Sequence, residues 1–130
     1  MSRPIIALDL EATGKSTTSD RIVQVGIYEN GTATTQLINP QMPIPPEATE
    51  IHHITDAMVA DAPTFAEYAP TLLKRIQGKD IVGFNHRNFD VPMLYEEFQR
   101  VGINWDVRGI NFIDVGTLFK KREPRTLEAA

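Results

Sequence analysis

The stretch from Ile5 to Gly14 constrains the fold and the chemistry of this chain more than any other. It is an apolar run that ends in two carboxylates and a glycine. Side chains alternate along a strand, so Asp9 and Glu11 share one face while Leu8 and Leu10 point to the other. The Cα atoms of the two acids would lie about 6.6 Å apart, and like charges at that distance favour a counter-ion. Oxygen ligands favour Mg²⁺ or Mn²⁺, so the strand ends either at a metal site or at a solvated pair of acids.

The composition predicts one globular domain over residues 1–130. The chain is 42% hydrophobic and 23% charged, and a domain of this length buries about two thirds of its unfolded surface. It has no cysteine, which excludes disulfides, thiolate zinc sites and cysteine nucleophiles. With no signal peptide and no run near the roughly 20 apolar residues of a membrane span, we expect a cytoplasmic protein without membrane contact.

The net charge of −4 bears on nucleic-acid binding. It argues against broad, nonspecific binding of duplexes through a basic face. Bound metal ions would reverse the sign of the charge locally, so a nuclease is still compatible with this balance.

A phosphate-binding P-loop is the alternative reading of the residues after this strand. Gly14-Lys15-Ser16-Thr17 matches the end of that motif, but its first glycine would fall at position 9, which is Asp9. No helix is expected to follow, because Arg21–Glu29 is rich in β-branched residues and is typical of a strand. The sequence therefore disfavours a P-loop.

The remaining pattern predicts an α/β fold with a mixed five-stranded sheet. Asn30-Gly31 is a strong hairpin signal that joins the strand at 21–29 to another at 32–38, so three antiparallel strands open the fold. Later elements are expected to be helices at 47–52, 55–60 and 64–76, a strand at 81–84, a helix at 91–101 and a strand at 111–115. Thr55 and Thr64 are the expected caps of the second and third helices.

Asp90 is the next acid expected at the carboxyl end of the sheet. Ligands of open α/β sheets collect there, and Asp90 opens the helix that follows the strand at 81–84. Alone it is typical of a helix cap. Together with Asp9 and Glu11 it becomes a candidate metal ligand.

Three motifs in combination resemble the DEDD superfamily of 3′-to-5′ exonucleases. They are Asp9-x-Glu11-x-Thr13-Gly14, Gly83-x-Asn85 leading into Phe89-Asp90, and Ile51-His52-x-Ile54-Thr55 followed by Asp61-Ala62-Pro63-Thr64-Phe65. Within that superfamily the chain is most similar to the DnaQ-like proofreading exonucleases of bacterial DNA polymerase III. The resemblance implies a ribonuclease H-like three-layer fold. It also implies that Asp9, Glu11 and Asp90 are three of four acids that hold two Mg²⁺ or Mn²⁺ ions and hydrolyse phosphodiesters at a 3′ end.

The same resemblance suggests residues and partners for substrate binding. Thr13 and Gly14 match the family's contacts to the 3′-terminal nucleotide, and Asn85 is expected to orient the junction that leads to Asp90. His52 either binds the nucleotide or stabilises its own turn. The implied partners are a single-stranded 3′ end of DNA or RNA and a DNA polymerase subunit.

One departure from the family pattern concerns its last motif, His-x-x-x-x-Asp, which supplies a general base and the fourth acid. The histidines are His52, His53 and His86, and none precedes an aspartate by five residues. His86 could serve as a substitute base, but the hypothesis that it is an exposed loop residue is favoured. Asp114 is expected to have a structural role.

The end of the sequence suggests where that motif belongs. Residues 125–130 are typical of the first turn of a helix, so we expect the chain to lack a C-terminal helix that carries the motif and to be impaired in hydrolysis. The alternative is a catalytically inactive, nuclease-derived module that binds nucleic acid or a polymerase.

Overall fold

The computed structural model describes residues 4–83 and 90–114, and these form five strands and four helices. The strands are β1 (Ile5–Ala12), β2 (Ile22–Glu29), β3 (Thr32–Leu37), β4 (Asp80–Gly83) and β5 (Phe112–Asp114). The helices are α1 (Pro46–His52), α2 (Asp56–Val59), α3 (Phe65–Ile76) and α4 (Asp90–Arg100). The described elements begin and end within two residues of the predicted bounds.

The strands form one mixed sheet in the order β3-β2-β1-β4-β5. The first three strands are antiparallel neighbours, whereas β4 and β5 run parallel to β1. The predicted mixed five-stranded sheet is therefore confirmed. β1 lies at its centre, and its pairing with β4 covers only Ile5 to Ala7, so the second half of β1 extends past β4.

The hairpin between β2 and β3 turns at Asn30 and Gly31, as predicted. Their φ angles are 55° and 81°, and a two-residue turn with two positive φ values matches the twist of the strands that it joins. Asn and Gly are the residues that adopt these angles at least cost.

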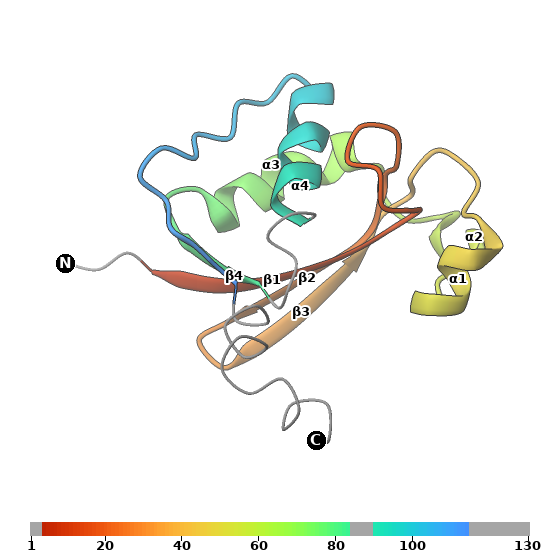
Figure 1. Cartoon of the computed structure of the whole chain (residues 1–130), viewed down its shortest axis with the longest axis horizontal. Coiled ribbons are helices and arrows are strands. Elements are labelled where there is room, and N and C mark those ends of the chain that lie inside the picture. Colours follow the sequence, from red (N-terminus) through yellow and green to blue (C-terminus); the bar gives the residue numbers. More distant parts are fainter. Residues whose placement is uncertain (1–3, 84–89, 115–130) are drawn as a thin grey trace.

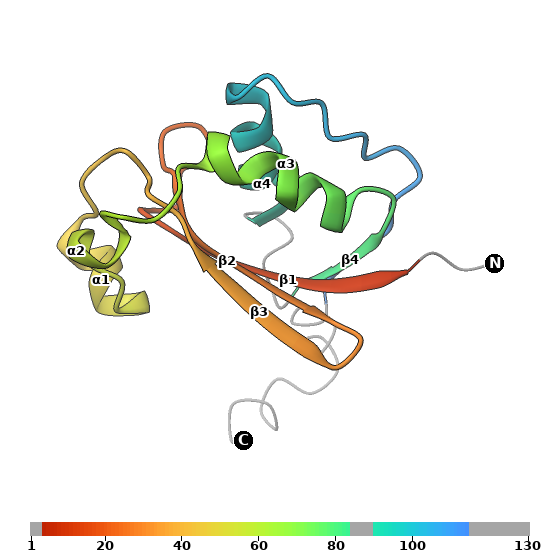
Figure 2. The ribbon, with the colours of Figure 1, turned by 180° about the vertical axis from the view of Figure 1, so that it is seen from behind.

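Two helices cover one face of the sheet. Figures 1 and 2 show α3 and α4 side by side on that face, with α1 and α2 beyond the end of β1. The alternate residues of β1 that face α3 and α4 are buried, namely Ile6, Leu8, Leu10 and Ala12. This alternation confirms that β1 presents its acids to the opposite face.

Helix α3 begins at a complete capping box. The Thr64 side chain accepts a hydrogen bond from the Glu67 amide, and the Glu67 carboxylate accepts one from the Thr64 amide. Its apolar stripe of Phe65, Ala69, Leu72 and Ile76 is buried, while Leu73 is only partly buried. Thr55 caps α2 in the same way, by accepting from the Met58 amide.

Four aromatic rings tie α3, α4 and β5 into one core. Phe65 packs edge-on against Phe98 at 5.2 Å between ring centroids, and Phe98 lies 5.7 Å from Trp105, which lies 6.2 Å from Phe112. A second, smaller cluster of Val23, Ile44, Ala48, Ile54 and Val59 holds α1 and α2 against the sheet. Over the described ranges no helix has the length and apolar character needed to cross a bilayer.

Candidate active site

Asp9 and Glu11 lie on the face of β1 that points away from α3 and α4. Asp9 is exposed and Glu11 is half-buried, whereas Leu8 and Leu10 are 2% and 3% exposed. The sheet pleat therefore places both carboxylates on one side, as the sequence predicts.

Asp90 lies next to them because α4 begins at the free edge of β1. Its Oδ2 atom accepts a hydrogen bond from the Leu10 amide at 3.1 Å, and the residue is only 2% exposed. Leu10 stands between Asp9 and Glu11, at a point where β4 no longer pairs with β1. If β4 were longer, the Leu10 N–H would donate to it; instead this N–H donates to the Asp90 carboxylate. The structure brings the three predicted acids to the same end of the sheet.

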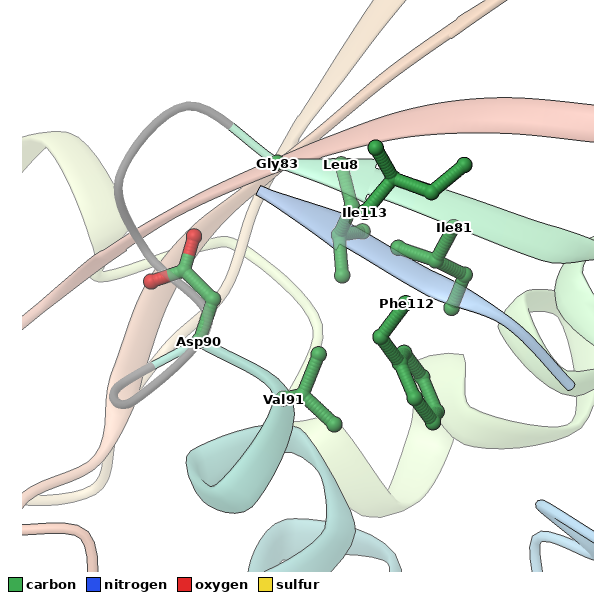
Figure 3. Close-up of a pocket in the computed structure, with 7 residues that line it drawn as sticks. All are labelled: Leu8, Ile81, Gly83, Asp90, Val91, Phe112 and Ile113. Carbon is green, nitrogen blue, oxygen red and sulfur yellow. The ribbon is translucent and has the colours of Figure 1, made fainter. Parts of the chain in front are cut away.

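The space beside Asp90 inside the core is closed. Figure 3 shows Asp90 at the first turn of α4, beside Gly83 and Ile113 at the ends of β4 and β5. The cavity that these residues line has a volume of about 10 Å³, which is at most the room of one water molecule. On this side of Asp90 there is therefore no room for a ligand larger than one water molecule.

The donor set suits a hard divalent cation. All three side chains are carboxylates, and Mg²⁺ and Mn²⁺ prefer oxygen ligands. Within residues 4–83 and 90–114 no three Asp, Glu or His side chains already form a ligand cluster. The three acids thus fit the metal in the chemistry of their oxygen donors, although in the described residues they are not gathered into a group that could hold it.

The turn after β1 is built around Asp20. Its Oδ1 accepts from the Thr13 hydroxyl and its Oδ2 from the Ser16 amide, both at 2.9 Å. A Cβ atom on Gly14 would lie 2.4 Å from Asp20 Oδ2, so any other residue at position 14 requires this carboxylate to move. The sequence reading missed Asp20, since nothing local distinguishes it from any other acid in a polar turn.

Thr13 is fully enclosed in this turn. It is 1% exposed, and its hydroxyl donates to Asp20 and accepts from the Arg21 amide at 3.0 Å. The predicted role of its side chain in substrate binding stays a prediction, while its place on the wall of the neighbouring groove is a feature of the structure.

An open groove runs from Glu11 along this turn to α1. Its volume is about 660 Å³, within the range of roughly 300–1,000 Å³ that is typical of small-ligand sites. Its lining includes the predicted site residues Glu11, Thr13, Gly14 and His52, together with Lys15, Asp20, Glu47 and the exposed Ile51. Three of the four predicted substrate-binding residues thus lie along one groove that starts at a candidate metal ligand.

His52 joins α1 to the end of β1. Its Nδ1 accepts from the Ile54 amide at 3.0 Å, so in the neutral ring Nε2 carries the proton and donates to the Ala12 carbonyl at 3.0 Å. These bonds support the turn-stabilising reading of His52. They also fix the distance between the two walls of the groove.

Several residues from the sequence reading lie outside the described ranges. Asn85 and His86 are among them, and the side chain of Asp114 is also not described.

Comparison with known proteins gives a consistent family. A family model described as exonuclease (RNase T) matches residues 6–128. The chain is 36% identical over 96 residues to the DNA polymerase III subunit epsilon of Treponema pallidum (strain Nichols), covering 70% of this chain and 44% of that protein. It is 32% identical over 130 residues to the 3′-5′ exonuclease DinG of Staphylococcus saprophyticus, covering 95% of this chain and 14% of that protein. The chain thus spans less than half the length of these relatives.

The fold also has counterparts among solved structures. A product-bound structure of exonuclease I matches with a TM-score of 0.81 and 17% identity, over 96% of this chain and 33% of that chain. This likeness shows the fold, and it confirms the predicted ribonuclease H-like arrangement of the sheet and helices.

Proposed function

Since the chain belongs to the exonuclease family whose model spans residues 6–128, we propose that it is a metal-dependent 3′-to-5′ exonuclease domain acting on DNA or RNA. The observation that carries this proposal is the hydrogen bond from the Leu10 amide to Asp90. It brings an acid from residue 90 to the strand that bears Asp9 and Glu11, at the head of a groove of nucleotide size.

Each residue of the site then has a role in the proposal. Asp9, Glu11 and Asp90 would be three of the four acids that hold two Mg²⁺ or Mn²⁺ ions, and those ions would supply a nucleophilic water and stabilise the leaving oxygen. The turn at Thr13 and Gly14 contacts the 3′-terminal nucleotide, where the glycine lets backbone approach the ligand. His52 holds α1, the second wall of the groove, against the end of β1. We propose that Asn85 orients the junction before Asp90.

The proposed partners follow from the charge and from the relatives. With a net charge of −4, the chain would bind a single-stranded 3′ end through bound metal rather than through a basic face. The relative from Treponema pallidum is a DNA polymerase III subunit, so we include a polymerase subunit among the proposed partners.

A second candidate is a nuclease-derived module that holds a 3′ end or a polymerase without cutting. The 130 residues contain no His-x-x-x-x-Asp motif, and the hydrolysis assay below separates the two candidates. A general base in that position is what the family resemblance implies for hydrolysis.

Metal binding tests the acids directly. Titration calorimetry with Mn²⁺ is expected to show at least a tenfold loss of affinity in Asp9→Ala, because one of few charged ligands is removed. Asp61→Ala is the matched control, since Asp61 is an exposed acid away from the groove. Equal affinities of the two variants would mean that the metal ligands are assigned wrongly.

Hydrolysis separates the two candidates. Single-stranded DNA and RNA with a 5′ label are incubated with Mn²⁺, with EDTA as the control, and a 3′-to-5′ enzyme is expected to give a ladder of products shortened from the 3′ end. The assay includes a version extended past Ala130. If the extended protein degrades neither substrate, the exonuclease proposal is refuted. Binding of a 3′ end without cleavage would favour the module.

A further inference from the structure

Helix α4 carries a second buried carboxylate on the same face as Asp90. Asp90 and Glu97 are 2% and 1% exposed. They stand seven residues apart, which is about two turns of helix, so both project toward β1 and β2. The helical period would call for an apolar residue at position 97, and a charge buried there needs specific partners.

Among the described residues, Glu97 bonds to the end of the connection between β1 and β2, to the first residue of β2 and to α4 itself. Its Oε2 accepts from the Ile22 amide at 2.9 Å, and its Oε1 accepts from Arg21 Nε at 3.0 Å. Arg100 adds a second cation at 3.3 Å from Oε1. Glu97 thus fixes the place where the chain re-enters the sheet at the start of β2.

These contacts reach the groove through Arg21. The Thr13 amide donates to the Arg21 carbonyl at 2.9 Å, and the Arg21 amide donates to the Thr13 hydroxyl at 3.0 Å. Arg100 also donates to the Thr18 carbonyl at 2.5 Å. The turn that contains Thr13 and Gly14 is therefore held by the same helix that carries Asp90.

We propose that Glu97 is a positioning residue: through Arg21 and Ile22 it sets where the Thr13–Gly14 turn lies relative to Asp90. The terminal nucleotide of a substrate is thereby bound at the place where the acids lie. This inference rests on the proposed function and deepens it. It predicts that Glu97 governs nucleotide binding while metal binding depends on Asp9, Glu11 and Asp90.

The test compares Glu97→Gln with Glu29→Gln. Glu29 also pairs with two cations, Lys79 at 2.7 Å and Arg75 at 3.6 Å, but it lies at the opposite end of β2, roughly 23 Å from Ile22. Both substitutions remove one charge and keep the shape of the side chain. In Glu97→Gln one carboxylate oxygen is replaced by an NH₂ group, which cannot accept a hydrogen bond. The bond from either Arg21 or the Ile22 amide is therefore lost.

The probes are Mn²⁺ alone and a 5′-fluorescein (dT)10 whose last linkage is a phosphorothioate, added with Mn²⁺. Glu97→Gln is expected to weaken (dT)10 binding about tenfold, because the turn loses a hydrogen bond to a charged group that holds it in place, with Mn²⁺ affinity unchanged. In hydrolysis assays KM rises and kcat stays constant. Amide exchange is expected to accelerate at Thr13 and not at Leu10. Arg21 is the partly exposed member of the ion pair with Glu97. Arg21→Gln is therefore expected to weaken (dT)10 binding as well, and it replaces Glu97→Gln in the test if that variant does not fold.

Three results would overturn the inference. One is unchanged (dT)10 affinity despite faster exchange at Thr13. Another is an equal loss of Mn²⁺ and (dT)10 affinity, which would assign Glu97 to general stability. The third is an equal effect of Glu29→Gln. If the unsubstituted chain binds neither probe, the proposed function itself fails, and that outcome is separate because it needs no variant.

Discussion

Gly14→Ala is expected to damage the turn after β1 through a single added carbon. The new Cβ would stand 2.4 Å from Asp20 Oδ2 and 2.7 Å from Asp20 Cγ. Ordinary contact begins near 3.4 Å, so the carboxylate must move by about 1 Å, and it is held in place by the Thr13 hydroxyl and the Ser16 amide. A shift of that size breaks at least one of these bonds.

The magnitude follows from what those bonds contribute. A hydrogen bond to a charged group stabilises by about 1.5–3 kcal/mol. The Thr13 bond is partly buried and the Ser16 bond is exposed, so solvent screening reduces the second. We therefore expect a loss of about 2 kcal/mol in the free energy of unfolding, or roughly 5–10 °C in Tm for a domain of this size.

A double-mutant cycle with Asp20→Ala isolates the clash. Denaturant unfolding gives the effect of Gly14→Ala in both backgrounds. Without the Asp20 carboxylate the added methyl has room, and the substitution is expected to be neutral or stabilising by about 0.4–1 kcal/mol because the unfolded chain loses freedom. If Gly14→Ala costs the same in both backgrounds, the contact with Asp20 is not the reason for glycine at this position.

Two further predictions concern parts of the molecule away from the metal ligands. Two hydrogen bonds from the Arg108 side chain and one from its amide lower the pKa of Asp106 from 3.8 to about 2, so this pair stabilises the fold above pH 3.8 and loses its effect as the pH falls toward 2. An NMR titration of Asp106 should show the low midpoint, and Arg108→Ala should return it toward 3.8; an unchanged midpoint in the variant would contradict the assignment. His52→Ala removes the bonds to Ala12 and Ile54 and should lower stability by about 1–2 kcal/mol in thermal unfolding, with the exposed His53→Asn as the control. Equal stability of wild type and His52→Ala would mean that the bonds do not hold the groove wall.

Local patterns in the sequence account for most of the elements and for the first two acids. The period of a strand is fixed at two residues, so Asp9 and Glu11 had to share the face opposite Leu8 and Leu10 once β1 was recognised. The hairpin at Asn30 and the capping box at Thr64 depend on contacts within a few residues of chain. Such features need no knowledge of the rest of the fold.

The sequence alone also determined the family, because several short motifs occurred together. Their combination pointed to an exonuclease, and the family match over residues 6–128 confirmed that reading. The individual motifs were ambiguous. Asp90 by itself was indistinguishable from a helix cap, and His52 had two readings.

Only the tertiary structure decided how these residues meet. The bond from Leu10 to Asp90 joins residues 80 positions apart, and the bond from Ile22 to Glu97 joins residues 75 apart. Both form only when α4 packs on the sheet beside the part of β1 that β4 does not cover. No local propensity encodes that packing, since it depends on the summed burial of the core around Phe98 and Trp105. The acids of β1 were visible from their spacing, but the helix that completes their site and holds the adjoining turn emerged only from the fold.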